Sequence, residues 1–360
     1  MNRLRVAVIG AGHLGSIHTR LISAIEQVQL VGVVDPSPEA RRRVANEFET
    51  QSFSHHSEII GQIDAAIVAV PTENHRFVGA DLLAHGIHLF VEKPLASTLD
   101  EANELVQLAN RRQLVLQVGH VERFNPAWQA AVPYIRRPRY IEAVRTSGYT
   151  GRSTDIGTVL DLMIHDLDLV LSQVRSEVVE VDAIGATIFG PHEDMAHAHL
   201  RFANGCIANL NASRTSFESQ RRMQIVTSRG YVGIDFAQPS AKLVRPSKEV
   251  LRGEIDVQHL SPEQREWVGG RLFDELLPIK DLAVENRNAI LDEQREFVDC
   301  IQHGKRPQVS GEEGRDCLCV AERILQRIRA ASPSINRQKT EKSVPTLLSK
   351  HDWPSQRKAG

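Results

Sequence analysis

The chain has 360 residues, of which 41% are hydrophobic and 24% are charged, a composition typical of globular enzymes with two domains. Its net charge of −2 lacks the basic excess that nucleic acids or anionic membranes attract. No apolar stretch approaches the roughly 20 residues that span a bilayer, and no signal peptide precedes the first predicted strand. Four cysteines in a chain of this length do not form a disulfide framework, so we expect a cytoplasmic location.

The first predicted strand, residues 5–9, leads directly into a glycine-rich turn, residues 10–15, and then into a helical pattern over residues 17–25. In this context the first glycine makes a tight turn, the second lets the backbone approach a pyrophosphate, and the third permits close helix–strand packing. The helix amino terminus would face the phosphates. The residues predicted here to bind a dinucleotide are Gly10, Gly12, His13, Leu14 and Gly15.

An acidic residue closes the second predicted strand, residues 30–34. Asp35 follows Gly15 by twenty residues, the separation at which an acidic side chain holds the adenosine ribose hydroxyls of a dinucleotide. Because a carboxylate repels a 2′-phosphate at this place, the sequence favours NAD over NADP. Three arginines, residues 41–43, form either a solvated helix face or a means of partial NADP tolerance.

Apolar strands then alternate with helical segments. Further strands are predicted at residues 65–70, 87–91 and 115–118, with a helix at residues 99–111. This alternation indicates a parallel, doubly wound sheet with right-handed crossovers. We therefore assign residues 1–119 to an NAD-binding α/β domain of the Rossmann type.

A lysine stands at the carboxyl end of the strand at residues 87–91, within the tripeptide Glu92-Lys93-Pro94. The carboxyl ends of parallel strands line the crevice where open α/β sheets bind ligands. The proline restricts the lysine's backbone, which suits a lysine that must point at a reacting atom. Pro71, Thr72 and His75 follow the preceding strand, and His75 either lies near the nicotinamide or is a polar residue at a helix start.

Beyond this domain, strands follow one another with hairpin signals between them, which indicates a mostly antiparallel sheet. Residues 250–283 are irregular, and two helices are predicted at residues 284–303 and 312–331. We assign residues 120–331 to a second α/β domain, for substrate binding and oligomerisation, and residues 332–360 to a polar tail. The strands predicted in the second domain lie at residues 140–146, 178–189, 195–202, 206–213, 223–227 and 231–236.

One predicted helix, residues 158–171, combines burial with ionisable side chains. It is apolar nearly all round, yet Asp161, His165 and Asp168 fall in one stripe at i, i+4 and i+7. Buried ionisable groups are destabilising unless they are paired or face a polar cavity. A substrate cleft between the domains would be such a cavity; a helix-stabilising Asp–His pair or an interface patch is the alternative.

Five motifs, taken in chain order, correspond to those of a known family: Gly10-x-Gly12-x-x-Gly15, Asp35, Pro71-Thr72 with His75, Glu92-Lys93-Pro94 and Asp161-x-x-x-His165. They resemble the Gfo/Idh/MocA family of oxidoreductases, over about residues 3–330. The resemblance implies a Rossmann domain plus an α/β domain with a large open sheet, one face of which commonly packs against another subunit in dimers or tetramers. The residues that line either such a face or an exposed one are His197, His199, Asn209 and Asn211.

Hydride transfer to NAD from a secondary hydroxyl needs a proton acceptor. His165 or Lys93 would take the proton, and Lys93 would stabilise the charge that develops on the oxygen. Asp161 would orient the imidazole or bind the adjacent hydroxyl, and no metal is required. The predicted substrate contacts are Lys93, Arg123, Asn125, Asp161 and His165. The predicted cofactor contacts are those of the glycine turn with Asp35, Pro71, Thr72, His75, Glu92 and Lys93.

Within the family, residues 119–126 and 159–166 look most like the enzymes that oxidise the 3-hydroxyl of UDP-N-acetylglucosamine to a ketone. In that group an aminotransferase then consumes the ketone on the way to a lipid A precursor. Two alternatives stay open: a dehydrogenase of another sugar or polyol, of the inositol or aldose type, and a dinucleotide-binding regulator without catalysis. Candidates for binding a nucleotide diphosphate, each of which could instead be a surface residue, are Arg123, Arg145, Arg152 and Arg214.

Overall fold

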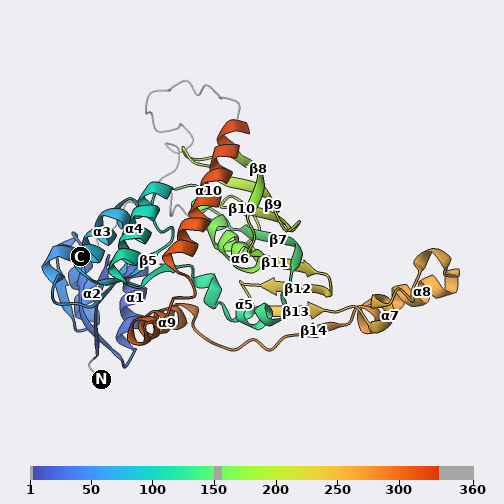
Figure 1. Cartoon of the computed structure of the whole chain (residues 1–360), viewed down its shortest axis with the longest axis horizontal. Helices are drawn as coiled ribbons and strands as arrows, with labels where there is room; N and C mark the ends of the chain where they lie inside the picture. The colour runs from blue at the N-terminus through green and yellow to red at the C-terminus, as the bar shows by residue number, and fades with distance from the viewer. Residues whose placement is uncertain (1–2, 150–155, 332–360) are drawn as a thin grey trace, which may run out of the picture.

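The computed structural model describes residues 3–149 and 156–331 (Figure 1). Six strands of the first domain form a parallel sheet in the order β3-β2-β1-β4-β5-β6, the order of a doubly wound dinucleotide-binding sheet. The predicted parallel sheet is confirmed, and its edge strand β3 was not predicted. The elements of this domain are β1 (Leu4–Ile9), α1 (His13–Ser23), β2 (Val28–Val34), α2 (Pro38–Glu47), β3 (Gln51–Phe53), η1 (His56–Ile59), β4 (Ala65–Val68), η2 (Thr72–Asn74), α3 (His75–Ala84), β5 (His88–Glu92), α4 (Leu99–Arg112) and β6 (Leu116–Gly119).

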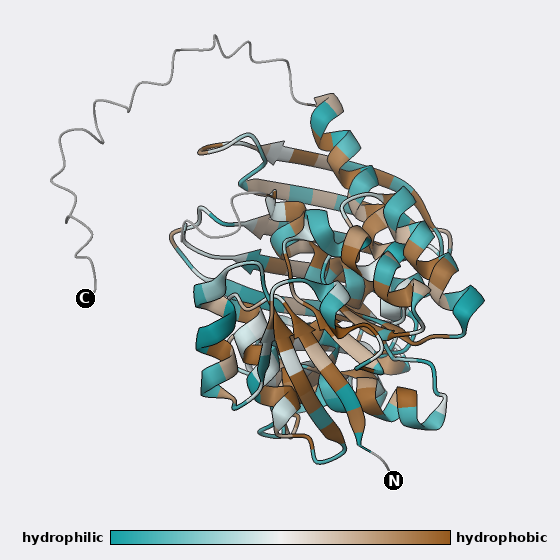
Figure 2. Ribbon diagram, turned by 90° about the vertical axis from the view of Figure 1, so that its left-hand side faces the viewer, coloured by the Kyte–Doolittle hydropathy of each residue, from teal (hydrophilic) through white to brown (hydrophobic). Residues whose placement is uncertain are grey.

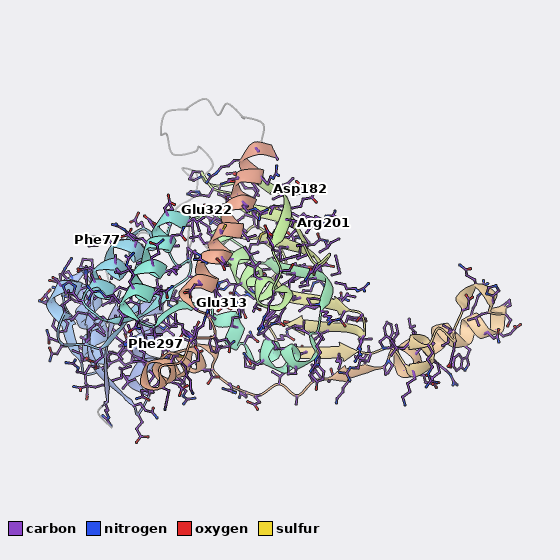
Figure 3. The ribbon with its side chains drawn as sticks, viewed as in Figure 1. Phe77, Asp182, Arg201, Phe297, Glu313 and Glu322 are labelled. Carbon is purple, nitrogen blue, oxygen red and sulfur yellow. The ribbon has the colours of Figure 1, made fainter. Side chains whose placement is uncertain are left out.

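The parallel sheet is covered on both faces, so its strands are apolar along most of their length (Figure 2). Helices α3 and α4 cover one face, and α1 covers the other together with α9 (Ala289–His303). Phe297 of α9 is fully buried against Phe90 of β5, with ring centroids 5.9 Å apart (Figure 3). A helix from late in the chain thus completes the core of the first domain.

The second domain is built on a sheet of eight strands in the order β14-β13-β12-β11-β7-β10-β9-β8. Neighbouring strands are antiparallel except for β7 and β10, which confirms the mostly antiparallel sheet. One face packs against α5, α6 and α10 to form the core. The remaining elements are η3 (Val121–Phe124), α5 (Pro126–Ala131), η4 (Val132–Tyr134), β7 (Pro138–Thr146), η5 (Val159–Met163), α6 (Ile164–Val174), β8 (Val178–Ala186), β9 (Met195–Phe202), β10 (Ile207–Ser213), β11 (Gln220–Thr227), β12 (Gly230–Asp235), β13 (Ser240–Val244), β14 (Ile279–Asp281) and α10 (Gly311–Ala331).

The long helix α10 lies between the two domains (Figure 3). The Glu322 carboxylate accepts a hydrogen bond of 2.9 Å from the Leu99 amide at the start of α4. On the other side, Arg323 donates to the Val178 carbonyl of β8 at 2.7 Å. One helix therefore contacts both domains and fixes their relative placement.

Two segments differ from the sequence prediction. The helix predicted at residues 158–171 begins as the π-helical turn η5 and continues as α6, so its side chains do not follow a uniform α-helical stripe. The segment predicted to be irregular contains four short helices and the edge strand β14, and it projects from the sheet (Figure 1). These helices are α7 (Lys248–Leu251), η6 (Val257–His259), α8 (Pro262–Gly270) and η7 (Leu272–Leu276).

The outer face of the second sheet carries the polar side chains noted in the sequence. His199 Nδ1 lies 2.8 Å from Asn209 Oδ1, and Asn209 Nδ2 donates to the Tyr140 hydroxyl at 3.1 Å. These contacts join three adjacent strands, β9, β10 and β7.

The predicted tail and Arg152 lie outside the described residues. No helix within the described part is long and apolar enough to cross a membrane.

Candidate active site

The glycine turn between β1 and α1 has the form that a bound pyrophosphate requires. Gly10 has a φ of 105°, and a side chain there would collide with the Ala69 carbonyl. A side chain at Gly15 would collide with the Gly10 carbonyl, whereas one at Gly12 would meet no atom within 4 Å. Gly12 is also the amino-terminal cap of α1, whose first turn contains His13 and Leu14. The open space therefore lies where a phosphate would approach the helix.

Asp35 lies beside this turn at the end of β2. Its carboxylate accepts hydrogen bonds of 2.8 Å from the amides of Ala11 and Ser37. Arg41 and Arg43 donate to backbone carbonyls around the same loop, so both guanidinium groups have protein partners. The acidic residue is thus next to the predicted phosphate site, as binding of an NAD ribose requires.

Lys93 and Asp161 meet across the junction of the two domains. Lys93 Nζ donates to the Asp161 carbonyl at 2.8 Å and lies 3.1 Å from its carboxylate Oδ1. The side chains are 14% and 20% exposed, so neither is sealed in the core. The Lys93–Pro94 peptide bond is cis. The structure therefore brings together two of the predicted catalytic residues from segments 68 residues apart in the chain.

His165 follows η5 at the start of α6, near the same lysine. Burial lowers its pKa well below the usual value, and the positive charges of Lys93 and Arg145 lower it further. Its Nδ1 atom is buried without a hydrogen-bond partner among the described residues. The imidazole is therefore neutral around pH 7 and can accept a proton. Asp161 pairs with Lys93, so the structure gives no support to an orienting bond from Asp161 to His165.

A buried hydrogen-bonded chain supports the strand end that carries Lys93. Glu92 accepts from the Lys93 amide at 3.1 Å and lies 2.7 Å from His18 Nε2. Gln294 of α9 contacts His18 Nδ1 at 2.8 Å and also donates to the His18 carbonyl, which identifies its amide nitrogen as the donor. His18 Nδ1 is then the acceptor, and Nε2–H points at Glu92. Burial opposes ionisation of Glu92, but the His18 bond and the Lys93 charge prevail and lower its pKa.

His75 lies behind the site rather than at its open side. Its ring is 1% exposed, with Nδ1 2.8 Å from the Pro94 carbonyl and Nε2 3.0 Å from the Val70 carbonyl. Burial lowers its pKa. The ring joins the loop after β4, which contains Pro71 and Thr72, to the turn after Lys93. This placement favours a supporting role over direct contact with the nicotinamide.

Arg123 and Asn125, both predicted to contact substrate, are committed to protein partners. Arg123 makes a bidentate pair with Asp168 at 2.6 and 3.0 Å, and both side chains are buried. Asn125 accepts from the Ala127 amide as the cap of α5 and donates to Glu122. The structure does not support substrate contacts by these two side chains, because folding already uses their polar atoms.

Two further arginines considered for a nucleotide diphosphate are also paired. Arg145 is held by Asp166 at 2.8 and 2.9 Å and by Glu122 at 2.8 Å, all within the buried junction. Arg214 is held by Asp194 at 2.8 Å and donates to the Ile156 carbonyl. These residues brace the second domain, so no diphosphate contact is assigned to them.

His120 is a candidate site residue that the sequence reasoning passed over. It follows β6, is 1% exposed, and neither ring nitrogen has a partner among the described residues. Burial lowers the pKa of His120, and the ring also interacts electrostatically with Lys93 and Glu92. The available signal was its position directly after a parallel strand, beside the strand β5 that precedes Lys93.

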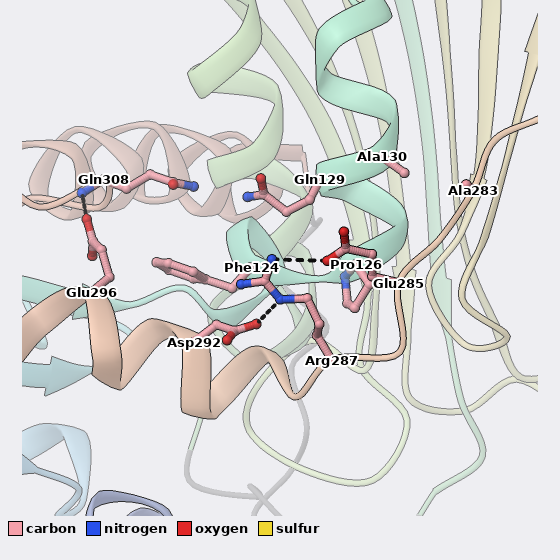
Figure 4. Close-up of a pocket in the computed structure, with 10 residues that line it drawn as sticks. All are labelled: Phe124, Pro126, Gln129, Ala130, Ala283, Glu285, Arg287, Asp292, Glu296 and Gln308. Atoms are coloured by element: carbon pink, nitrogen blue, oxygen red, sulfur yellow. Dashed lines mark hydrogen bonds and ion pairs between the residues drawn. The ribbon is translucent and has the colours of Figure 1, made fainter. Parts of the chain in front are cut away.

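A separate cavity of 390 Å³ lies beneath η3 and α5 (Figure 4). Its lining includes Asp292 and Glu285, both paired with Arg287, as well as Glu296, whose pKa is raised by burial. None of the predicted catalytic residues lines it. The three carboxyl groups make it unsuited to a diphosphate.

Among residues 3–149 and 156–331, no group of three or more His, Cys, Asp or Glu side chains could hold a metal ion.

The fold and the glycine turn define a dinucleotide-binding protein. Residues 4–120 match the family model described as an oxidoreductase family with an NAD-binding Rossmann fold, and residues 130–233 match the Gfo/Idh/MocA carboxyl-terminal domain. The chain belongs to the Gfo/Idh/MocA family and is an NAD-dependent oxidoreductase. The predicted family, fold class and cofactor are confirmed.

Individual relatives span nearly the whole chain. UDP-N-acetylglucosamine 3-dehydrogenase of Acidithiobacillus ferrooxidans is 33% identical and aligns over 92% of this chain and 99% of its own. Its solved structure superposes with a TM-score of 0.80 over the same shares of the two chains. The NAD-dependent scyllo-inositol 2-dehydrogenase of Bacillus subtilis is 26% identical and aligns over 86% of this chain and 89% of its own. A levoglucosan dehydrogenase is 16% identical with a TM-score of 0.76, over 92% of this chain and 98% of its own, which shows the common fold.

Proposed function

We propose that this enzyme oxidises the 3-hydroxyl of UDP-N-acetylglucosamine to the 3-keto sugar with NAD. Oxidation of a sugar hydroxyl is supported by one observation above all: the Lys93–Asp161 pair lies beside neutral His165 at the carboxyl edge of the dinucleotide-binding sheet. The choice of sugar is supported by the similarity to the Acidithiobacillus enzyme, 33% over 92% of this chain.

The residues present fit NAD. The space over Gly12 and the start of α1 would receive the pyrophosphate, and Asp35 would bind the adenosine ribose. Bound NAD would supply the hydride acceptor. Pro71 and Thr72, in the loop after β4, and Glu92 with Lys93, at the end of β5, would border the nicotinamide end.

The protein would position the sugar and manage the hydroxyl proton. Lys93 Nζ, now 3.1 Å from Asp161 Oδ1, could donate to the reacting oxygen and stabilise its developing negative charge. Asp161 would hold the ammonium or accept a bond from the adjacent hydroxyl. The neutral imidazole of His165 could accept the proton. Both orders, with Lys93 or His165 as the immediate acceptor, are consistent with this arrangement.

The test is a screen for NADH formation by the purified enzyme with matched sugars. UDP-N-acetylglucosamine should give the highest kcat/KM. UDP-glucose, free N-acetylglucosamine and scyllo-inositol probe in turn the acetamido group, the nucleotide and the sugar class. Mass spectrometry should show a product two hydrogens lighter than the substrate. Equal or greater turnover of a free sugar or an inositol would overturn the proposed substrate while keeping sugar oxidation.

Oxidation of a free polyol is the second candidate. The arginines expected to hold a diphosphate are engaged: Arg123 with Asp168, and Arg145 with Asp166. A scyllo-inositol dehydrogenase is also among the relatives. Calorimetry with UDP alone separates the two, because only a nucleotide-sugar enzyme should bind UDP in competition with its substrate. A chain that binds NADH but oxidises none of these compounds would instead be a regulator.

The same proposal includes a homodimer or homotetramer and a cytoplasmic location where NAD and UDP-sugars are available. A 3-keto nucleotide sugar would be consumed by an aminotransferase, as in lipid A precursor synthesis. A coupled assay with such an aminotransferase and glutamate should increase NADH formation, since removal of the ketone pulls the oxidation forward.

A further inference from the structure

Residues 248–277, here called the arm, leave the eight-stranded sheet between β13 and β14 and project away from the rest of the chain (Figure 1). The arm contains only helices of three to nine residues. Isolated helices of this length are marginal in water, and most helical stability in proteins comes from packing. An arm of this kind therefore needs a surface to pack on.

The arm is nevertheless locally well formed. Ser261 and Gln264 make a capping box at the start of α8, and Arg271 lies over the Trp267 ring at 5.1 Å. No residue of α8 is buried, and Leu251, Trp267 and Phe273 are each about half exposed, at 57%, 45% and 48%. Large apolar side chains presented in this way mark an interaction surface.

The arm is also acidic. Between residues 248 and 277 there are seven acidic and four basic residues, a net charge of 4 − 7 = −3, whereas the whole chain has −2. The acidic residues are Glu249, Glu254, Asp256, Glu263, Glu266, Asp274 and Glu275. The partner surface should therefore be basic and partly aromatic.

A pocket of that character lies where the arm joins the sheet. Its volume is 730 Å³, and its lining contains no carboxylate. Two tyrosines line it, and Arg245 lies over the Tyr134 ring at 5.3 Å. All four of its arginines are exposed: Arg136, Arg137, Arg229 and Arg245.

We propose that the arm of one copy of this chain docks in the four-arginine pocket of a second copy. Of the arm, only Leu251 at its base lines the chain's own pocket, and the rest of the arm projects away from it (Figure 1). Each copy carries both complementary surfaces. A twofold arrangement would therefore use both arms and both pockets at once. This inference specifies the surface of the oligomer proposed above and does not depend on which sugar is oxidised.

Charge reversal tests the contact in the full-length enzyme. Arg136→Glu with Arg229→Glu in the pocket, or Glu266→Arg with Asp274→Arg in the arm, should each raise the dimer dissociation constant at least about 100-fold, because like charges would face one another. All four changes in one chain should restore association. Analytical ultracentrifugation measures the constants, and Glu26→Arg, on the first domain, is the charge-matched control. Retained NADH binding and circular dichroism would establish that each variant is folded.

The proposal is overturned if the unaltered enzyme is monomeric at micromolar concentration, or if either reversed pair associates as the unaltered enzyme does. It is also overturned if the four-change variant fails to regain association while remaining folded. A pocket that binds UDP or pyrophosphate, with association unaffected by the arm changes, would identify a small-anion site instead. Sugar oxidation is measured in a separate assay, so failure of the arm–pocket contact does not contradict the proposed oxidation, and failure of the oxidation does not contradict the contact.

Discussion

Asp161 and Asp168 lie within the same predicted helix, yet in the structure they differ in exposure and in charge partner. Asp161 is 20% exposed and pairs with Lys93, whereas Asp168 is 1% exposed and makes a bidentate pair with Arg123. The first pair lies at the open edge of the dinucleotide-binding sheet, and the second lies in the junction beneath it. The charge partner and the exposure of each side chain, rather than its spacing along the helix, thus distinguish Asp161, a candidate catalytic residue, from Asp168, a structural one.

The contrast has a physical basis. A lysine ammonium is a point charge on a flexible stem that can transfer its contact from Asp161 to a substrate oxygen. The planar guanidinium of Arg123 matches both oxygens of Asp168 and loses two bonds if it moves. Substitutions in the two pairs should therefore affect different measurements.

Lys93→Ala should lower kcat by about 10⁴-fold, because the proton-handling group and the charge that stabilises the alkoxide are lost together. The free energy of unfolding should change by less than about 1 kcal/mol, since the pair is partly exposed. Steady-state kinetics and urea unfolding measure the two effects. Lys305→Ala, at an exposed pair with Asp299, is the control and should leave kcat unchanged. Turnover near that of the unaltered enzyme would remove Lys93 from the mechanism.

Asp168→Ala should lower the free energy of unfolding by about 3–5 kcal/mol, because it removes the buried bidentate partner of Arg123 and leaves only the longer contact with Glu313, at 3.6 Å. Guanidinium unfolding gives the value. Glu180→Ala, which breaks the exposed pair with Arg201, should cost at most about 1 kcal/mol. If Asp168→Ala and Glu180→Ala lowered the free energy of unfolding equally, Asp168 would have no special structural role.

His165→Ala should lower kcat by about 10²–10³-fold if the imidazole takes the proton. The pKa of His165 lies well below 6.5 because burial and the Lys93 charge disfavour the imidazolium. The base is therefore active at neutral pH, and kcat/KM should fall only when the pH drops through that lowered pKa. In Lys93→Ala the pKa of His165 should rise, which NMR of labelled histidine can follow directly. An unchanged titration would contradict the placement of the two groups.

His18→Ala should lower kcat about tenfold without changing the substrate, because Glu92 loses its buried partner and no longer holds the Lys93 strand end firmly. His18→Asn or Gln294→Ala should have a smaller effect. A positioning role predicts that kcat falls more than KM rises. Loss of NADH binding in parallel with kcat would indicate general damage to the first domain.

Asp35→Ser should shift the ratio of kcat/KM values from NAD towards NADP by about tenfold. The reason is that the carboxylate beside the glycine turn no longer repels a 2′-phosphate. Glu39→Ser, on the following helix, is the matched control. An unchanged ratio would place the ribose elsewhere.

Much of this site could be predicted from the sequence because its residues occur at fixed places on regular elements. The glycine turn, Asp35 and Lys93 each follow a parallel strand, and such strand ends converge on one edge. His120 follows the same rule and was passed over. A sequence does not show which polar groups already pair within the folded chain, as Arg123 does with Asp168 and Asn125 with Glu122.

For the arm, too, the sequence predicts only part of the structure. Its sequence lacks a strong period, so residues 250–283 were predicted to be irregular, although Ser261 and Gln264 carry a recognisable cap signal. The projection of the segment from the sheet depends on β13 and β14 pairing, a contact between strands separated by the entire arm.

The sequence by itself determined the family, the parallel sheet and the dinucleotide turn, because these depend on local spacing of glycine, apolar and acidic residues. It also supplied Lys93, Asp161 and His165. Only the tertiary structure decided that Asp161 meets Lys93, that Asp168 belongs to Arg123 and that His18 supports Glu92. Each of these contacts joins segments distant in the chain, and the burial that sets its electrostatics exists only after the two domains have packed together.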